Sequence, residues 1–223
     1  TNASDNNEKV YFVTKDKDGK VVREEIIKTD ENQTWVVEEA ARQLQILQND
    51  REYQHTFIAI NLSGRHLTQV SQLNKLIALI KAQEFEPQRL ILEFNESAFS
   101  QHEELAVKGL RKLKNNGIKL ALDDYASGIS SFSFLHSYPF EFIKLDRDFI
   151  NTLKSSDKNL PLVKALRELG EEYGYRLVAE GIETEDVMQK LHSVGCDFGQ
   201  GYHISKPEKL QTSLVLGQDK SCA

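Results

Sequence analysis

Polar residues that can bind a metal ion or transfer a proton follow short apolar runs along this sequence. They are Asn61, Glu93, Asp123 with Asp124, Lys144, Glu180 and Gln200. Hard divalent cations prefer carboxylate and carbonyl oxygens as ligands. Several carboxylates gathered beside one lysine would repel one another strongly if no cation were bound. Two Mg²⁺ or Mn²⁺ ions would relieve this repulsion, and such a pair can clamp a phosphodiester for hydrolysis.

Each of these residues, taken alone, has an ordinary explanation. An Asp-Asp pair after a strand is more often a loop or a helix cap, and Asn61 before Leu-Ser is more often a turn residue. Lys144 alone would be a surface lysine, and Glu180 with Glu183 a solvated loop. The same pattern recurs at six successive strand ends, however, and this recurrence favours a joint site.

The apolar runs predict buried parallel strands at 57–60, 90–92, 118–122, 142–143 and 177–179, and a sixth run, 196–199, ends at Gln200. Amphipathic helices are expected between them, with apolar faces that contain Val70, Leu73, Leu76, Ile77 and Ile80; Leu105, Leu110 and Leu113; and Leu162, Val163, Leu166 and Leu169. Alternating strands and helices predict βαβ units, and so many units favour a TIM-type (β/α) barrel. Its strands would end at one mouth. Asp18-Gly19 between apolar runs predicts an N-terminal β-hairpin, and a helix is expected over 35–48.

Length and composition bound the remaining possibilities. The 223 residues suit one domain, which we place at 10–210, between a disordered segment 1–9 and a loose tail 211–223. The net charge of −6 argues against general nucleic-acid binding, and no apolar run is long enough to span a membrane. Two cysteines without CxxC spacing suggest neither a disulfide framework nor zinc, so a cytoplasmic location is expected. The chain begins at Thr1, as a piece of a longer protein with further domains would.

Six segments in unbroken order resemble the motifs of the EAL family of bacterial cyclic di-GMP phosphodiesterases. Residues 120–131, Leu-Ala-Leu-Asp-Asp-Tyr-Ala-Ser-Gly-Ile-Ser-Ser, and then Lys144-Leu-Asp146 resemble the family's DDFGxGxSS and KxD segments. The other matching segments are Asn61-Leu-Ser63, Glu93-Phe-Asn-Glu96, Ala179-Glu-Gly-Ile-Glu183 and Gln200-Gly-Tyr202. The resemblance implies a TIM-type barrel in which one of the first strands runs antiparallel to the rest.

The resemblance also implies a role for each matching residue, and hydrolysis of cyclic di-GMP to linear pGpG. The implied ligands of the two Mg²⁺ or Mn²⁺ ions are Glu25, Asn61, Glu93, Asp123, Asp124 and Glu180. The implied catalytic residues are Lys144, which orients the attacking water, with Glu180 and Gln200. Glu96 is expected to anchor the loop after Asp124, and Glu183, Gln200, Gly201 and Pro207 to contact the substrate. The family also suggests a homodimer through residues 125–136, where Phe132, Phe134 and Leu135 could serve equally as core.

The family's name motif, EALxR, is altered here. We prefer the match to Glu25-Ile26-Ile27-Lys28-Thr29, although a match around Lys9 would place a lysine at the ligand position. Thr29 replaces the arginine that grips a ligand phosphate, and only 36 residues separate Glu25 from Asn61, fewer than is usual in the family. Ala126 stands where the family has glycine, so it would be strained if the position needs a positive φ.

Three functions of different classes remain open from the sequence. The first is a metal-dependent phosphodiesterase, weakened by the loss of the arginine. The second is a receptor that binds cyclic di-GMP without cutting it, and the third is a degenerate barrel that binds another protein. The retained carboxylates favour the first, because such a cluster is costly to keep without metal.

Overall fold

The computed structural model describes residues 10–16, 21–26, 33–48, 53, 56–96, 99, 102–126 and 132–206. The predicted segment 1–9 and tail 211–223 lie outside these ranges, as do Lys9, Thr29 and Pro207. Within the described ranges, no helix is both long and apolar enough to cross a membrane.

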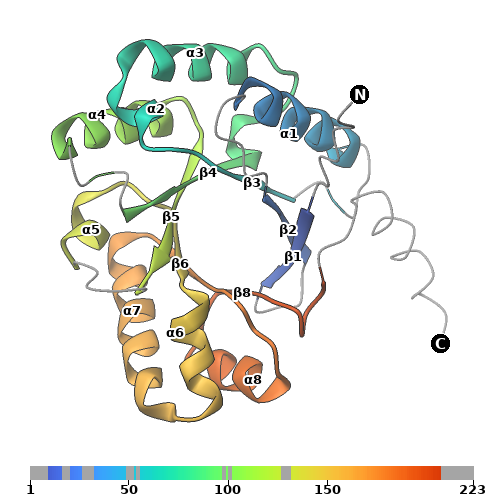
Figure 1. Cartoon of the computed structure of the whole chain (residues 1–223), viewed down its shortest axis with the longest axis vertical. Coiled ribbons are helices and arrows are strands. Elements are labelled where there is room, and N and C mark those ends of the chain that lie inside the picture. The colour runs from blue at the N-terminus through green and yellow to red at the C-terminus, as the bar shows by residue number, and fades with distance from the viewer. Residues whose placement is uncertain are drawn as a thin grey trace, which may run out of the picture.

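Eight strands form one sheet that curls into a barrel (Figure 1). The strands are β1 (Val10–Asp16), β2 (Val21–Ile26), β3 (Ile58–Asn61), β4 (Leu90–Asn95), β5 (Lys119–Tyr125), β6 (Phe142–Leu145), β7 (Arg176–Ala179) and β8 (Phe198–Gln200). Their order in the sheet is β2-β1-β8-β7-β6-β5-β4-β3. Strands β3 to β8 pair in parallel, whereas β1 pairs antiparallel with β2 and with β8. The end strands β2 and β3 lie next to each other. The predicted TIM-like α/β fold is confirmed.

Helices surround the sheet on its outer face (Figure 1). The helices are α1 (Gln33–Gln48), α2 (Arg65–Thr68), α3 (Val70–Lys81), α4 (Glu103–Asn115), α5 (Phe132–Ser137), α6 (Arg147–Asn151), α7 (Leu160–Tyr173) and α8 (Glu185–Ser193). The described residues also contain the short 3₁₀ turns η1 (Pro87–Arg89), η3 (Thr152–Lys154) and η4 (Asp157–Asn159). Helix α8 begins where the Thr184 hydroxyl accepts a hydrogen bond from the Val187 amide, and α7 ends at Gly174, whose φ is +82°.

The apolar helix faces are largely as predicted, but three predicted members of these faces are exposed. Val70, Leu105 and Leu162 are 63%, 43% and 37% exposed. In α4 the buried face consists of Ala106, Gly109, Leu110 and Leu113. A side chain on Gly109 would overlap the Leu67 backbone, so the close contact between α2 and α4 fixes the rotation of α4. Leu105 precedes Ala106 by one residue and is therefore turned about 100° away from this face.

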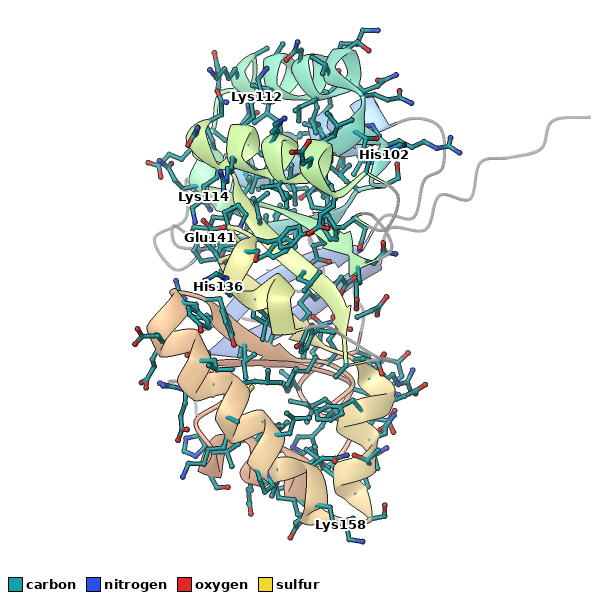
Figure 2. All side chains as sticks on the ribbon, turned by 90° about the vertical axis from the view of Figure 1, so that its left-hand side faces the viewer. His102, Lys112, Lys114, His136, Glu141 and Lys158 are labelled. Carbon is teal, nitrogen blue, oxygen red and sulfur yellow. The ribbon has the colours of Figure 1, made fainter. Side chains whose placement is uncertain are left out.

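Two apolar clusters fill the fold on either side of the sheet. The larger cluster lies between the strands and the helices. The smaller one fills the barrel with one inward-facing residue from each parallel strand: Ala59, Ile91, Ala121, Phe142, Val178 and Phe198. A polar contact also joins two of the outer helices, because Lys112 of α4 donates a hydrogen bond to Asn74 of α3 at 2.5 Å (Lys112 is labelled in Figure 2). The interior is therefore a packed core, and a site has to lie at a barrel mouth.

Candidate active site

The parallel register brings the predicted polar residues to one mouth of the barrel. Asn61 is the last residue of β3 and lies opposite Glu93 of β4. Asp123 of β5 lies opposite Asn95 of β4. Glu180 directly follows β7, and its amide donates to the Leu145 carbonyl at 3.2 Å. Because parallel strands end at the same mouth, these positions converge at the carboxyl end of the barrel.

Lys144 lies at the centre of a network of carboxylates at this mouth. Its Nζ is 2.8 Å from Glu93 Oε2, 3.1 Å from Asp123 Oδ1 and 2.7 Å from Glu180 Oε1. The Lys144 and Glu93 side chains are only 3% and 2% exposed. The ammonium has three N–H donors, and it faces three carboxylates. Lys144 is therefore a buried counterion of the cluster and differs from the surface lysine that this residue, taken alone, would suggest.

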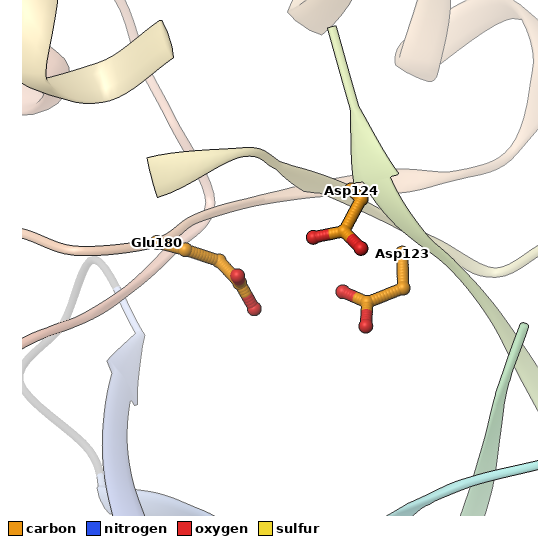
Figure 3. A group of neighbouring side chains, drawn as sticks. All are labelled: Asp123, Asp124 and Glu180. Atoms are coloured by element: carbon orange, nitrogen blue, oxygen red, sulfur yellow. The ribbon is translucent and has the colours of Figure 1, made fainter. Parts of the chain in front are cut away.

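Three carboxylates at this mouth could hold a metal ion together. Oxygens of Asp123, Asp124 and Glu180 all lie within 4.8 Å of one another. Figure 3 shows both aspartates on β5 and Glu180 on the facing segment, with their carboxylates directed toward one another. Asp123 Oδ1 is buried and accepts no hydrogen bond, although the Lys144 ammonium is close enough for an ion pair. A buried oxygen of this kind needs a further partner, and an all-oxygen donor set fits Mg²⁺ or Mn²⁺.

A backbone irregularity explains why two successive aspartates share one site. Neighbouring side chains of a regular strand point to opposite faces. Here the pairing of β5 with β6 shifts register between Leu122 and Tyr125, and Asp124 has a φ of +56°. Such a bulge redirects the side chain and brings both carboxylates into the cluster.

Ala126 has a φ of +71°, so this position adopts the positive φ on which the predicted strain depends. Alanine is strained in this region and glycine is not.

The segment after β7 is fixed by contacts that the sequence reasoning missed. Glu183 receives hydrogen bonds from Lys154 Nζ at 2.7 Å and Arg147 Nη2 at 2.6 Å. These contacts, Lys154 first and then Arg147, lower the pKa of Glu183. Gly181 has a φ of +69°, and a side chain there would overlap Arg147. Two features of the sequence could have indicated these contacts: Arg147 directly follows Asp146, and Gly181 lies between Glu180 and Glu183.

Gln200 and Gly201 complete the mouth at the end of β8. The Gln200 side chain is buried, and the Gln200 carbonyl accepts a hydrogen bond from the Ile182 amide at 3.0 Å. A side chain at Gly201 would overlap the Ile182 backbone, so glycine is required by close approach. The predicted substrate contacts of Gln200, Gly201 and Glu183 remain predictions, and Pro207 lies outside the described residues.

Two further predicted residues are Glu96 and Glu25. The pKa of Tyr125 is raised to about 12, mainly by burial and then by the charge of Glu96. Glu96 is thus close to the residue that follows the aspartate pair, where its anchoring role was predicted. Glu25 lies in β2, opposite Tyr11 of β1, and its side chain is outside the described part of the chain.

Asp146 has a local structural role that the sequence reasoning did not assign. Its Oδ1 accepts hydrogen bonds from the Asp148 and Phe149 amides at 2.9 and 3.1 Å and so caps α6. The cap fixes the start of the short helix that carries Arg147. The Lys144-Leu-Asp146 segment therefore combines a site residue with the helix cap that follows it.

Comparison with known proteins places this arrangement in a family. The family model for the EAL domain matches residues 12–207. Over 150 residues the chain is 35% identical to cyclic di-GMP phosphodiesterase PA2567 of Pseudomonas aeruginosa, covering 67% of this chain and 26% of that protein. Over 181 residues it is 32% identical to the bifunctional diguanylate cyclase/cyclic di-GMP phosphodiesterase MucR of the same organism, covering 81% and 26%. The chain thus spans about a quarter of these two relatives.

Solved structures agree with the sequence comparison. The PaMucR phosphodiesterase in complex with c-di-GMP superposes with a TM-score of 0.80 and 25% identity, covering 92% of this chain and 93% of that one. The EAL domain of Mycobacterium smegmatis DcpA superposes with a TM-score of 0.82 and 27% identity, covering 96% and 97%. Family model, relatives and fold all agree with the motif resemblance, and the chain belongs to the EAL domain family.

Proposed function

We propose that this domain is a cyclic di-GMP phosphodiesterase that opens the cyclic dinucleotide to linear pGpG with two divalent cations. The observation that carries the proposal is the cluster of Asp123, Asp124 and Glu180, in which the buried Lys144 pairs with Asp123 and Glu180. Relatives that share the family are named as cyclic di-GMP phosphodiesterases. The cluster supports metal-assisted hydrolysis because its donors are all oxygen atoms and one of them is buried without a hydrogen bond.

The residues that would hold the cations are those at the strand ends. We assign one ion to Asn61, Glu93 and Asp123 with Glu25, and the second to Asp124 and Glu180. When bound, Mg²⁺ or Mn²⁺ ions polarise a phosphodiester and lower the pKa of a water molecule. The protein's own part is to hold these oxygens in place, through the bulge at Asp124 and the hydrogen-bonded segment that follows β7.

Lys144 would orient the attacking water, together with Gln200. In this structure the Lys144 ammonium lies within 3.1 Å of three carboxylates and donates a hydrogen bond to Glu93, so a water can approach it only when one of these carboxylates turns to another partner. Divalent cations are such partners. Lys144 would therefore be available to orient the water only when metal ions occupy the carboxylates.

Weak binding of cyclic di-GMP is part of the proposal. Thr29 stands in place of the family's phosphate-gripping arginine, and a charge-assisted contact of that kind typically contributes ~1.5–3 kcal/mol. Its loss corresponds to an affinity lower by roughly 10- to 100-fold. The short segment between Glu25 and Asn61 would reduce affinity further by exposing one guanine. Thr29→Arg should restore part of this affinity if Glu25 is the motif glutamate, and should have no effect if the motif lies at Lys9.

The association state also remains a prediction. The family suggests a two-fold contact through residues 125–136. Tyr125 and Leu135 are both 3% exposed and pack in the core, so they are not available as surface anchors. Sedimentation at tens of micromolar tests the dimer, and a monomer there would leave the proposed hydrolysis unaffected.

A titration with cyclic di-GMP, with and without Mn²⁺, together with product analysis, tests the function. We expect metal-dependent binding and slow release of pGpG, and no product from Lys144→Ala, which should still bind metal. Tight, metal-independent binding without product would contradict hydrolysis and indicate a receptor. If neither the unmodified chain nor Thr29→Arg binds, the remaining function is that of a protein-interaction module.

A further inference from the structure

The opposite mouth of the barrel carries two cationic side chains that the proposed reaction does not use. Ala59, Ala121 and Val178 face the barrel interior. Side chains two residues apart on a strand share a face. Phe57, Lys119 and Arg176 each precede one of these interior residues by two positions, so they form the next layer toward the N-terminal mouth. Lys119 is half-buried and Arg176 is exposed, so both charges remain in contact with water.

Aromatic rings support both cations from the interior side. Lys119 Nζ lies 3.8 Å from the centre of the Phe57 ring. Arg176 Cζ lies 5.5 Å from the centres of both the Phe142 and Phe198 rings, which are 5.9 Å apart. These cation–π contacts fix the two charged groups at the mouth. Among the described residues, no side-chain hydrogen bond from either charged group is found, so their donors can face the solvent.

The two charges also lack a neutralising carboxylate within the part of the chain that the structure describes. The positive charge of Arg176 helps to lower the pKa of Lys119, after the larger effect of burial, so the two cations act on each other. Glu141 is close enough to oppose this effect. Its carboxylate, however, already pairs with Lys114 at 2.9 Å and accepts the Leu120 amide at 2.9 Å (Lys114 and Glu141 are labelled in Figure 2). Neither Lys119 nor Arg176 forms an ion pair with a described carboxylate.

We propose that the N-terminal mouth of the barrel binds a small phosphate-bearing anion between Lys119 and Arg176. The planar guanidinium of arginine matches two phosphate oxygens, and the lysine adds a compact charge. The position is separate from the proposed active site, because Lys119 and Asp123 are four residues apart on β5, which is about 13 Å along a strand. The carboxylates of the opposite mouth repel phosphate in the absence of metal, so the two mouths can be tested separately.

Titration of the metal-free domain with inorganic phosphate in EDTA, followed by calorimetry, tests the proposal. The decisive variant is Lys119→Gln with Arg176→Gln. The matched control is Lys75→Gln with Arg111→Gln, because these two residues are exposed on α3 and α4. We expect the unmodified domain and the control to bind phosphate equally, and the decisive variant to bind at least about tenfold more weakly. Equal binding by all three proteins, or an effect that potassium chloride of equal ionic strength reproduces, would overturn the proposal.

Two further variants test whether a folding defect or the carboxylate of Asp16 explains the result. Arg176→Lys preserves the charge but loses the planar donor pair, so it should fold normally and bind phosphate several-fold more weakly. Asp16 lies opposite Phe198 in the β1–β8 ladder. Asp16→Asn should leave phosphate binding unchanged or make it tighter. Binding that appears only in Asp16→Asn would show that the protein's own carboxylate fills the position, and the proposal would then be wrong.

A parallel titration with guanosine monophosphate distinguishes the two sources of a phosphate group. Tighter binding than that of inorganic phosphate identifies a nucleotide, whereas equal binding identifies a bare phosphate. Because no metal is present, neither result depends on the proposed hydrolysis. Failure of the anion site and failure of the phosphodiesterase proposal are therefore distinguishable.

Discussion

Replacing Lys144 by methionine should destabilise the metal-free domain and at the same time tighten its binding of Mn²⁺. In the unmodified protein the ammonium lies between 2.7 and 3.1 Å from Glu93, Asp123 and Glu180. Methionine keeps most of the side-chain volume but removes the charge. Three carboxylates then face one another at a mouth where Glu93 is only 2% exposed. A divalent cation is the partner that can replace the lost ammonium.

The size of both effects follows from the burial of this network. Removing one partner of a buried ion pair typically costs 3–5 kcal/mol, because a charge is left without compensation. In a domain of this size that loss lowers the Tm by roughly 10 °C. Two unit charges 4 Å apart interact by about 4 kcal/mol at an effective dielectric constant near 20. Relief of even part of the repulsion between ammonium and metal therefore corresponds to at least a tenfold gain in Mn²⁺ affinity, at ~1.4 kcal/mol per tenfold.

Thermal unfolding of both proteins across a Mn²⁺ titration measures the two effects together. The stabilisation at saturating metal should be larger in Lys144→Met than in the unmodified domain, since bound metal stabilises in proportion to the logarithm of its concentration over Kd. Lys164→Met on the exposed face of α7 is the matched control. The double variant Glu93→Gln with Lys144→Met should recover part of the lost stability. A loss below about 1 kcal/mol, or weaker Mn²⁺ binding by Lys144→Met, would refute the reasoning.

The remaining predictions concern single positions. Ala126→Gly should stabilise the domain by about 0.5–1 kcal/mol in chemical unfolding, because glycine adopts the φ of +71° without strain; a destabilised variant would contradict this. Asp123→Asn should reduce the Mn²⁺-dependent rise in Tm while leaving the metal-free domain as stable or more stable. Burial raises the pKa of Cys196 to about 12. In a Cys222→Ser variant, which leaves Cys196 as the single thiol, a thiol reagent at pH 8 should therefore react only after unfolding. The lowered pKa of Glu183 means that its ion pairs stabilise above the ordinary value of 4.5 and cease to do so as the pH falls further. Glu183→Gln should therefore reduce stability more at pH 7 than at acidic pH below 4.5, and an effect that does not decrease as the pH falls would count against these contacts.

Much of the fold and the location of the site followed from local patterns. Apolar runs that end in polar residues predict parallel strands whose carboxyl ends share one mouth, and register then decides which side chains meet. Asn61 and Glu93 illustrate this, because they are polar positions near the carboxyl ends of two neighbouring strands and lie directly opposite each other. The motif order added the identity of the family, which the EAL domain model confirms.

Contacts across the barrel could not be predicted in the same way. No local pattern distinguishes a surface lysine from Lys144, whose burial depends on carboxylates of three other strands or their ends. The exposed Leu105 shows a second limit, because the rotation of α4 is fixed by the contact of Gly109 with Leu67. The contacts of Glu183 with Arg147 and Lys154 join residues that are 36 and 29 positions apart. Such contacts depend on how the elements pack together, and spacing along one element gives no sign of them.

The charge balance of the mouth supports two cations in place of one. Glu93, Asp123, Asp124 and Glu180 contribute four negative charges against the single positive charge of Lys144, which leaves −3. One divalent ion would still leave a negative mouth, and such a mouth would repel the phosphodiester of cyclic di-GMP. Two ions reverse the sign, or bring it to neutrality if Glu25 also contributes. If Thr29 replaces the phosphate-binding arginine, as the preferred motif match predicts, binding of the proposed ligand cyclic di-GMP should depend mainly on the metals, and the domain should lose this ligand whenever it loses them.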